Sequence, residues 1–316
     1  MPASAATNEA TSSRESSAPF MSDESPRLNS PIVIKLWPEG VPDQTSPPPP
    51  RQTDTRRYWS INDPDLTVFP AAKPAPGAPL ILVIPGGGYH RNSWLNGGLR
   101  IARWLNQAGI TAAVLKYRLS EYNYPSQLQD AQRALRMLRR RAASLGGRPD
   151  NIGVIGASAG GHLAAHLATT WDLDTGLVPD DFSTTNARPD FQILLYPVVT
   201  GQEPHVHHAS RRHVLGEHPT EEQIAAFSLE GLVRPDTPPA FIVATGRDQV
   251  VPIENSLMLY RALREAGVPV DLHLYEEGAH GFGVQNVDLP VSGWTNLAIQ
   301  WMRHHKFLSP VVPTSN

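Results

Sequence analysis

The chain contains no cysteine among its 316 residues, which excludes a disulfide framework, a thiol nucleophile and thiolate-bound metal. It also lacks an apolar run of the roughly 18 to 20 residues that a bilayer span needs. Its first 20 residues hold no apolar block of the kind found in a secretory signal. We therefore expect a soluble protein with no membrane span. Its compartment stays open: cytoplasm is the default, and secretion or a periplasmic location applies if a leader has been removed.

A strong excess of charge of one sign is also missing. The formal net charge is −3 and the pI is about 6.5, so no electrostatic footprint for nucleic acid is present. The only basic cluster lies at 133–148, where Arg133, Arg136 and Arg140 are spaced as one helix face opposite an apolar stripe. This spacing predicts a solvated outer helix face and no nucleic-acid partner.

Signatures of cofactor and metal sites are absent as well. The glycine run Gly86–Gly88 follows an apolar stretch, but it has neither G-x-G-x-x-G spacing nor a Lys-Ser/Thr pair, so a nucleotide is disfavoured. The cluster around His205, His207 and His208 has no accompanying Asp, Glu or Cys set with ligand spacing. We predict no cofactor and no metal.

The chain is long enough for one large core, and 40% of its residues are hydrophobic. We expect one catalytic domain over residues 31–308, a disordered N-terminal tail over 1–30 and a C-terminal tail over 309–316. Short apolar runs alternate with segments that have helical periodicity, which predicts a mostly parallel α/β sheet with helices on both faces. The segment 200–236 interrupts this alternation and is expected to be a lid-like insertion. Predicted strands are 80–84, 111–116, 152–156, 192–196, 241–245 and 270–275, with edge strands at 31–37 and 66–69, and predicted helices are 97–108, 126–145, 160–170, 254–266 and 291–305.

Ser158 is the candidate nucleophile. It lies in Gly156-Ala157-Ser158-Ala159-Gly160, between a predicted strand and a predicted helix. The flanking glycines permit the sharp turn that exposes a serine hydroxyl at a sheet edge. The helix that follows directs its N-terminal N–H groups toward any negative charge that forms there.

A serine hydroxyl needs a base, and the base needs an acid that orients it. Asp248 lies in a loop directly after the strand 241–245, and His280 lies in a glycine-rich loop directly after the strand 270–275. Other acids fit less well, because Asp271 falls inside a predicted strand and the acids at 172–181 follow no predicted strand. We predict the catalytic group Ser158, His280 and Asp248.

Three glycines after the strand 80–84 can point backbone N–H groups at one position without obstruction by side chains. We predict an oxyanion hole formed by the N–H groups of Gly87, Gly88 and Ala159. Each such donor is typically worth on the order of 3 kcal/mol of transition-state stabilisation.

Together these motifs resemble the α/β-hydrolase superfamily. More narrowly, the chain is similar to the bacterial feruloyl-esterase-like and acetylxylan-esterase-like proteins of its esterase branch. The likeness is carried by Pro85–Tyr89, Gly156–His162, Thr245–Pro252 and Gly278–Phe282. One departure is Pro85, where lipase-type relatives have a histidine, so the oxyanion loop must be held in another way.

The resemblance implies an α/β-hydrolase fold and a serine carboxylester hydrolase that acts through an acyl-enzyme, without a cofactor. It suggests short acyl esters, acetyl or feruloyl, of carbohydrates, so that the partner is a small-molecule or oligosaccharide ester. Tyr89 and Trp94 are aromatic residues expected to contact the substrate. Acyl length, the alcohol portion and oligomeric state are not specified by these motifs.

Two alternatives remain open. The first is a serine peptidase of the prolyl-oligopeptidase type, although the chain has no room for the propeller domain that usually accompanies that activity. The second is a non-catalytic binding protein on the same scaffold, which is expected to have lost a catalytic position, whereas Ser158, Asp248 and His280 are all present.

Overall fold

The computed structural model describes residues 28–42, 54–177, 179–285 and 288–309. Most of the two expected tails, 1–30 and 309–316, lies outside the described residues. Within the described part, the chain forms an eight-stranded sheet in the order β1-β2-β4-β3-β5-β6-β7-β8. The strands are β1 (Ile32–Lys35), β2 (Asp65–Phe69), β3 (Leu80–Ile84), β4 (Thr111–Lys116), β5 (Ile152–Ala157), β6 (Phe191–Leu195), β7 (Ala240–Thr245) and β8 (Val270–Tyr275).

The sheet is mostly parallel, as predicted. Strand β1 pairs antiparallel with β2, and β2 pairs antiparallel with β4. All pairs in the remaining order β4-β3-β5-β6-β7-β8 are parallel. The strands predicted at 80–84, 111–116 and 270–275 have the observed bounds, and the other parallel strands differ by one residue at one end or at both. The α/β-hydrolase fold expected from the sequence is confirmed.

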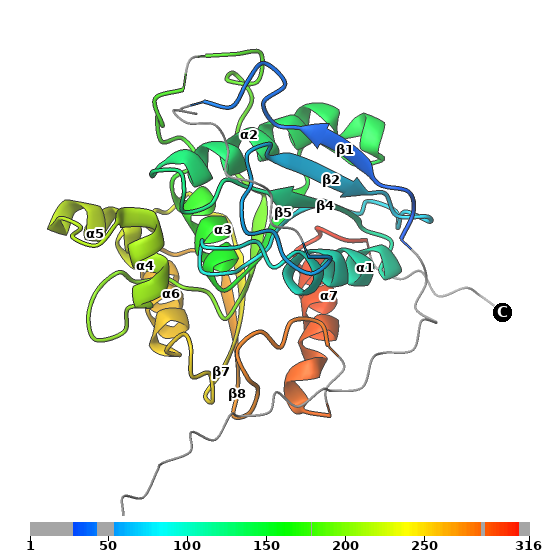
Figure 1. Cartoon of the computed structure of the whole chain (residues 1–316). Coiled ribbons are helices and arrows are strands. Elements are labelled where there is room, and N and C mark those ends of the chain that lie inside the picture. Colours follow the sequence, from blue (N-terminus) through cyan, green and yellow to red (C-terminus); the bar gives the residue numbers. More distant parts are fainter. Residues whose placement is uncertain (1–27, 43–53, 178, 286–287, 310–316) are drawn as a thin grey trace, which may run out of the picture.

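Helices cover both faces of the sheet (Figure 1). One buried cluster joins the sheet to α1 (Arg100–Gln107) and α7 (Trp294–His304). The other joins it to α2 (Ser126–Arg141), α3 (Ala159–Thr169) and α6 (Glu254–Glu265). Each strand in the middle of the sheet must therefore be apolar on both sides, which explains the continuous apolar runs in the sequence.

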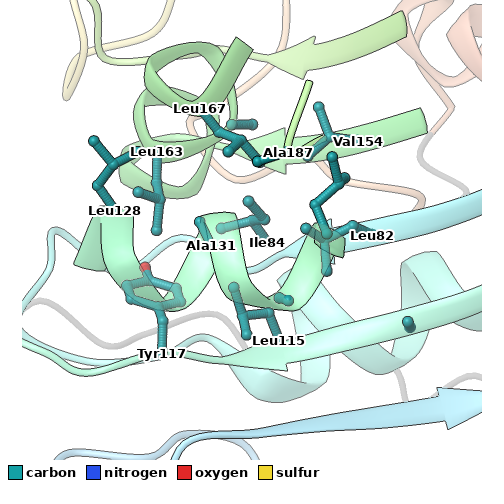
Figure 2. Close-up of a cluster of buried hydrophobic side chains, with 14 of the residues drawn as sticks. Leu82, Ile84, Leu115, Tyr117, Leu128, Ala131, Val154, Leu163, Leu167 and Ala187 are labelled. Atoms are coloured by element: carbon teal, nitrogen blue, oxygen red, sulfur yellow. The ribbon is translucent and has the colours of Figure 1, made fainter. Parts of the chain in front are cut away.

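Strand β3 illustrates this two-sided burial. Figure 2 shows Leu82 and Ile84 in the buried cluster that also contains Ala131 of α2 and Leu163 of α3. The alternate residues Ile81 and Val83 belong to the cluster on the opposite face. All four side chains are fully buried, and each contributes about 2 kcal/mol through the hydrophobic effect.

Two predicted helices are interrupted near their ends. The helix expected at 97–108 begins as a wide π turn, Trp94–Leu99, before α1. Gly97 and Gly98 make this turn fit closely, because a Cβ on Gly97 would lie 3.1 Å from Pro85 Cα and one on Gly98 would lie 2.8 Å from a Val114 methyl carbon. The helix expected at 126–145 ends at Arg141 and continues as a 3-10 turn, Ala143–Leu145, which Gly146 closes at φ 76°.

The prediction of a solvated arginine face on α2 is wrong for Arg133. This side chain is buried, with its guanidinium 4.1 Å from the centre of the Trp37 ring. It forms ion pairs with Glu39, at 2.6 Å, and with Asp180. The polar connection after α3 folds over this helix face, so the arginines pair with acids and carbonyl groups that are distant in the sequence.

The insertion at 200–236 contains two short helices, α4 (His208–Leu215) and α5 (Glu221–Phe227), and a 3-10 turn at Leu229–Gly231. Helix α5 begins at a capping box in which Thr220 and Gln223 satisfy each other's backbone N–H groups.

Among the described residues, no helix combines the length and the apolar character that crossing a bilayer requires.

Candidate active site

Ser158 lies at the turn between β5 and α3 with φ 57° and ψ −125°. This is a sparsely populated conformation for a residue with a Cβ, and it costs of order 1–3 kcal/mol that the surrounding structure must offset. The glycines of the motif are sterically required. A Cβ on Gly156 would overlap the carbonyl of Gly160, and a Cβ on Gly160 would overlap the carbonyl of Ile84 at the end of β3.

The structure brings together the three side chains that the sequence singled out. His280 Nε2 lies 2.9 Å from Ser158 Oγ, and His280 Nδ1 lies 2.7 Å from Asp248 Oδ2. An ionised carboxylate only accepts hydrogen bonds, so Nδ1 carries a proton and donates a hydrogen bond to Asp248. With neutral His280, Nε2 then accepts from the Ser158 hydroxyl, which is the arrangement in which imidazole can act as a general base.

Asp248 is held by backbone as well as by His280. Its Oδ1 accepts hydrogen bonds from the N–H groups of Val250 at 2.8 Å and Val251 at 3.0 Å, and its side chain is 3% exposed. Burial acts to raise the pKa of this carboxyl, but the hydrogen bond and charge of His280 and the two backbone donors outweigh it and lower the pKa. Asp248 is therefore ionised and fixed in orientation at neutral pH.

The glycine loop after β3 packs directly on the serine turn. A Cβ on Gly86 would lie 3.1 Å from Ser158 Cβ. Gly87 and Gly88 have φ 130° and 65°, which residues with a side chain rarely adopt. The N–H groups of Gly87, Gly88 and Ala159 have no acceptor among the described residues, so they remain available to an oxyanion.

Comparison with known proteins decides the family. The BD-FAE family model matches residues 66–263. The chain belongs to the BD-FAE family.

Several relatives of this BD-FAE chain are esterases or xylan-degrading enzymes by name. An endo-1,4-beta-xylanase B of Butyrivibrio fibrisolvens is 37% identical over 68% of the chain, and an acetylxylan esterase of Xylanibacter ruminicola is 34% identical over 66%. The matched parts span 34% and 42% of the lengths of these two proteins.

Two solved structures that are similar to this chain are also ester hydrolases by name. An acetyl ester-xyloside bifunctional hydrolase from Caldicellulosiruptor lactoaceticus has a TM-score of 0.75 and 34% identity, over 91% of this chain and all of that one. Esterase 2 of Thermogutta terrifontis, solved after phosphoramylation by tabun, has a TM-score of 0.69 and 25% identity over 90% of this chain and 98% of that one.

The two aromatic residues expected to contact substrate are both buried in this BD-FAE chain. Trp94 is 8% exposed, and its ring packs against Tyr58 at 5.4 Å between centroids and under the Lys116 ammonium at 4.7 Å. This placement is typical of a packing residue and gives the prediction for Trp94 no support. Tyr89 is 2% exposed, and its hydroxyl bonds to His162 Nδ1 at 2.7 Å.

His162 lies one helical turn after Ser158 and was not predicted from the sequence as a site residue. Its Nε2 lies 2.9 Å from the carbonyl of Phe227, which can only accept, so Nε2 carries the proton and Nδ1 accepts from the Tyr89 hydroxyl. Burial first, and then the nearby His166, lower the pKa of His162 to about 3. His162 is therefore a neutral link between Tyr89, which follows the glycine loop, and the end of α5.

A cavity of about 180 Å³ lies beside this link. Its walls are mainly apolar and are formed by residues of α2, α3, α4 and α5, including His162 of α3. Tyr89, which follows the glycine loop, also lines it. Ser158 is not part of its lining, so the cavity adjoins the site and does not contain it.

The insertion 200–236 contacts the glycine loop that follows β3. His213 Nδ1 lies 2.7 Å from the carbonyl of Gly88. His207 Nδ1 accepts from the backbone N–H of Ser210, and burial together with the nearby His280 lowers the pKa of His207 to about 4.

Among the described residues, no group of three His, Cys, Asp or Glu side chains is arranged to hold a metal ion.

Proposed function

We propose that this protein is a serine carboxylester hydrolase that acts through an acyl-enzyme on short acyl esters of carbohydrates. One observation carries the proposal: Asp248, His280 and Ser158 form a continuous hydrogen-bonded chain at 2.7 and 2.9 Å, beside backbone N–H groups that have no acceptor among the described residues. Acyl transfer requires this combination of an activated hydroxyl, an oriented base and preorganised donors.

In the first half of the reaction, Ser158 Oγ attacks the ester carbonyl carbon while its proton moves to His280 Nε2. The carbonyl oxygen becomes an oxyanion that accepts from the N–H groups of Gly87, Gly88 and Ala159. When this intermediate collapses, the bond to the alcohol oxygen breaks and His280 returns the proton to that oxygen. Asp248 stabilises the imidazolium that forms between the two transfers.

In the second half, a water molecule adds to the acyl carbon and gives a proton to His280. The bond between the acyl carbon and Ser158 Oγ then breaks, and the proton passes from His280 to the serine oxygen. A carboxylic acid leaves, and the resting side chains are restored. The same oxyanion donors serve both halves, so their loss is expected to slow both.

The relatives support the substrate class. An acetylxylan esterase and an acetyl ester-xyloside hydrolase are similar to this chain, which favours an acetyl ester of a xylose-containing carbohydrate. The esterase modified by tabun supports a serine route, because organophosphates react with an activated serine hydroxyl. We expect acetyl esters to be preferred, with feruloyl esters as the second acyl group.

A panel of nitrophenyl esters from acetate to octanoate, assayed beside acetylated xylan, tests this proposal. The acetate ester and acetylated xylan should be turned over by the wild type and not by Ser158→Ala, whereas Ser144→Ala, at an exposed serine, should behave as the wild type. A preference for octanoate would reject the substrate class and leave the mechanism standing. Release from a proline-containing peptide amide would favour a peptidase, and inactivity of the folded wild type on every ester would favour a binding protein.

A further inference from the structure

The geometry points to His213, in the covering insertion, as a positioning residue for the oxyanion hole. This inference rests on the proposed function, because it concerns how the same N–H groups are held. The loop Pro85–Tyr89 lacks the histidine that lipase-type relatives place at its start, so another group must hold it. The hydrogen bonds to the carbonyl groups of the loop show which groups hold it.

Each of the five carbonyl groups in the loop accepts a hydrogen bond, and the donors to four of these five carbonyls come from the body of the domain. The Tyr117 hydroxyl donates to Pro85 at 2.8 Å, and Ser93 N–H donates to Gly86 at 2.9 Å. Further backbone N–H groups donate to the carbonyls of Gly87 and Tyr89: His90 at 3.2 Å and Arg91 at 3.1 Å to Gly87, and Ser120 at 2.9 Å to Tyr89.

Gly88 is the exception, because its donor belongs to the insertion. His213 Nδ1 lies 2.7 Å from the Gly88 carbonyl, and since a carbonyl only accepts, His213 Nδ1 carries the proton. The His213 ring also stacks on His90, with 5.1 Å between ring centroids and 21° between the planes. Two contacts therefore fix the orientation of the imidazole.

The carbonyl of Gly88 matters because glycine offers little resistance to rotation of the peptide planes on either side of it. One of these planes carries the Gly88 N–H, which is a proposed oxyanion donor. That plane also contains the Gly87 carbonyl, which His90 and Arg91 hold, whereas the Gly88 carbonyl lies in the next plane. With the Gly88 carbonyl free, the bonds to Gly87 alone would resist a rotation at Gly88 that shifts the N–H. The hydrogen bond from His213 restrains the second of the two planes that meet at Gly88, so docking of α4 helps to fix the orientation of the donor before substrate binds.

Helix α4 also approaches the other half of the site. His207, at its N-terminus, is close enough to His280 and Asp248 to interact with both electrostatically. The start of the insertion is attached to α6, because the buried Asn255 of α6 donates a hydrogen bond to the carbonyl of His205 at 2.8 Å. The segment that leads into α4 is thus held by α6, and α4 itself contacts the glycine loop through His213.

Two substitutions separate the hydrogen bond from the ring. His213→Asn keeps an N–H donor close to the position of Nδ1 and removes the ring, and His213→Phe keeps the ring that stacks on His90 and removes the donor. His208→Ala is the matched control, because His208 lies on the same helix and its side chain is 70% exposed. The measurements are kcat and KM for nitrophenyl acetate and the inhibition constant of a trifluoromethyl ketone, whose tetrahedral adduct places an oxyanion in the hole.

We expect His213→Phe to lower kcat about 10- to 100-fold, below the effect of deleting an oxyanion donor outright, with little change in KM. The inhibition constant should rise by the same factor as kcat/KM falls, and His213→Asn and His208→Ala should stay within about threefold of wild type. Thermal unfolding checks the fold. If His213→Phe does not fold, His213→Gln replaces it, since its amide reaches the position of Nε2 and not that of Nδ1.

The inference is overturned if His213→Phe retains full kcat, because Gly88 then needs no donor from the insertion. Equal losses in His213→Asn and His213→Phe would also overturn it, since the ring and not the hydrogen bond would then matter. A change confined to KM would assign His213 to substrate binding instead. Inactivity of the folded wild type would refute the proposed function itself, and this inference with it.

Discussion

Acidification from pH 7 to pH 5 is expected to destabilise the folded chain through two buried histidines of α3. Burial, and then the neighbouring His166, lower the pKa of His162 to about 3, and burial lowers the pKa of His166 to about 4. In the unfolded chain both titrate near 6.5. Between the folded and the unfolded pKa values, the unfolded chain binds protons that the folded chain does not. The stability that the two neutral histidines contribute is therefore complete above pH 6.5 and is lost as the pH falls toward 4.

The size of the effect follows from the proton linkage. One pKa unit corresponds to about 1.4 kcal/mol, so between pH 7 and pH 5 each histidine removes about 2 kcal/mol from the free energy of unfolding. Together they account for about 4 kcal/mol, which is a large part of the 5–15 kcal/mol typical of a domain. The loss should be visible before most carboxyl groups begin to titrate.

Urea unfolding at pH 7, 6 and 5 measures this loss. The variant His162→Gln cannot titrate at this position, so its free energy of unfolding should fall by about 2 kcal/mol less than that of the wild type over the same range. His218→Gln, at an exposed histidine, serves as the control and should follow the wild type. Parallel pH profiles for the wild type and His162→Gln would refute the assignment of His162 as a buried neutral group.

Three further substitutions probe the fold and the site. Gly160→Ala should cost several kcal/mol or abolish folding, because its methyl group would overlap backbone at the end of β3, and circular dichroism with thermal unfolding measures this. Arg118→Met should cost about 3–5 kcal/mol in urea unfolding, since it leaves Asp130 buried without its ion-pair partner, whereas Arg148→Met at an exposed pair should change nothing measurable. Asp248→Asn should lower kcat by about 10⁴-fold in the nitrophenyl acetate assay and leave the melting temperature near that of the wild type. An unchanged kcat would remove Asp248 from the mechanism.

The parts of the fold that were predictable are those in which local sequence and final environment agree. A parallel strand covered on both faces must be a short apolar run, and turns at the sheet edge need glycine or proline, so both features are visible without a structure. The loops that carry Ser158, Asp248 and His280 follow such strands directly. Because the carboxyl ends of parallel strands meet at one edge, their order along the chain was enough to predict that they converge.

Other features depend on partners far away in the sequence, and they were missed for that reason. Arg133 was assigned to solvent because its helix face is polar, but Glu39 and Asp180 reach it from two separate segments. The sequence predicts that Trp94 contacts substrate, but in the structure Trp94 is buried and its ring packs against Tyr58. No local pattern distinguishes an aromatic residue that contacts substrate from one that fills a core.

The same limit applies to the insertion. Its five histidines could be counted in the sequence, but helix periodicity could not indicate that His213 contacts the loop at Gly88. That contact joins residues 125 positions apart, and the segment that leads into α4 is held by a hydrogen bond from Asn255 of α6. Such a hydrogen bond is fixed by tertiary packing alone.

Reaction with a fluorophosphonate probe tests whether Ser158 is an activated nucleophile. Intact-mass measurement of the folded wild type should show one covalent adduct, peptide mapping should locate it on Ser158, and Ser158→Ala should remain unlabelled. Loss of labelling should parallel loss of nitrophenyl acetate hydrolysis. An adduct on another residue, or no adduct on a folded protein that still hydrolyses the ester, would contradict the assignment of Ser158 as the nucleophile.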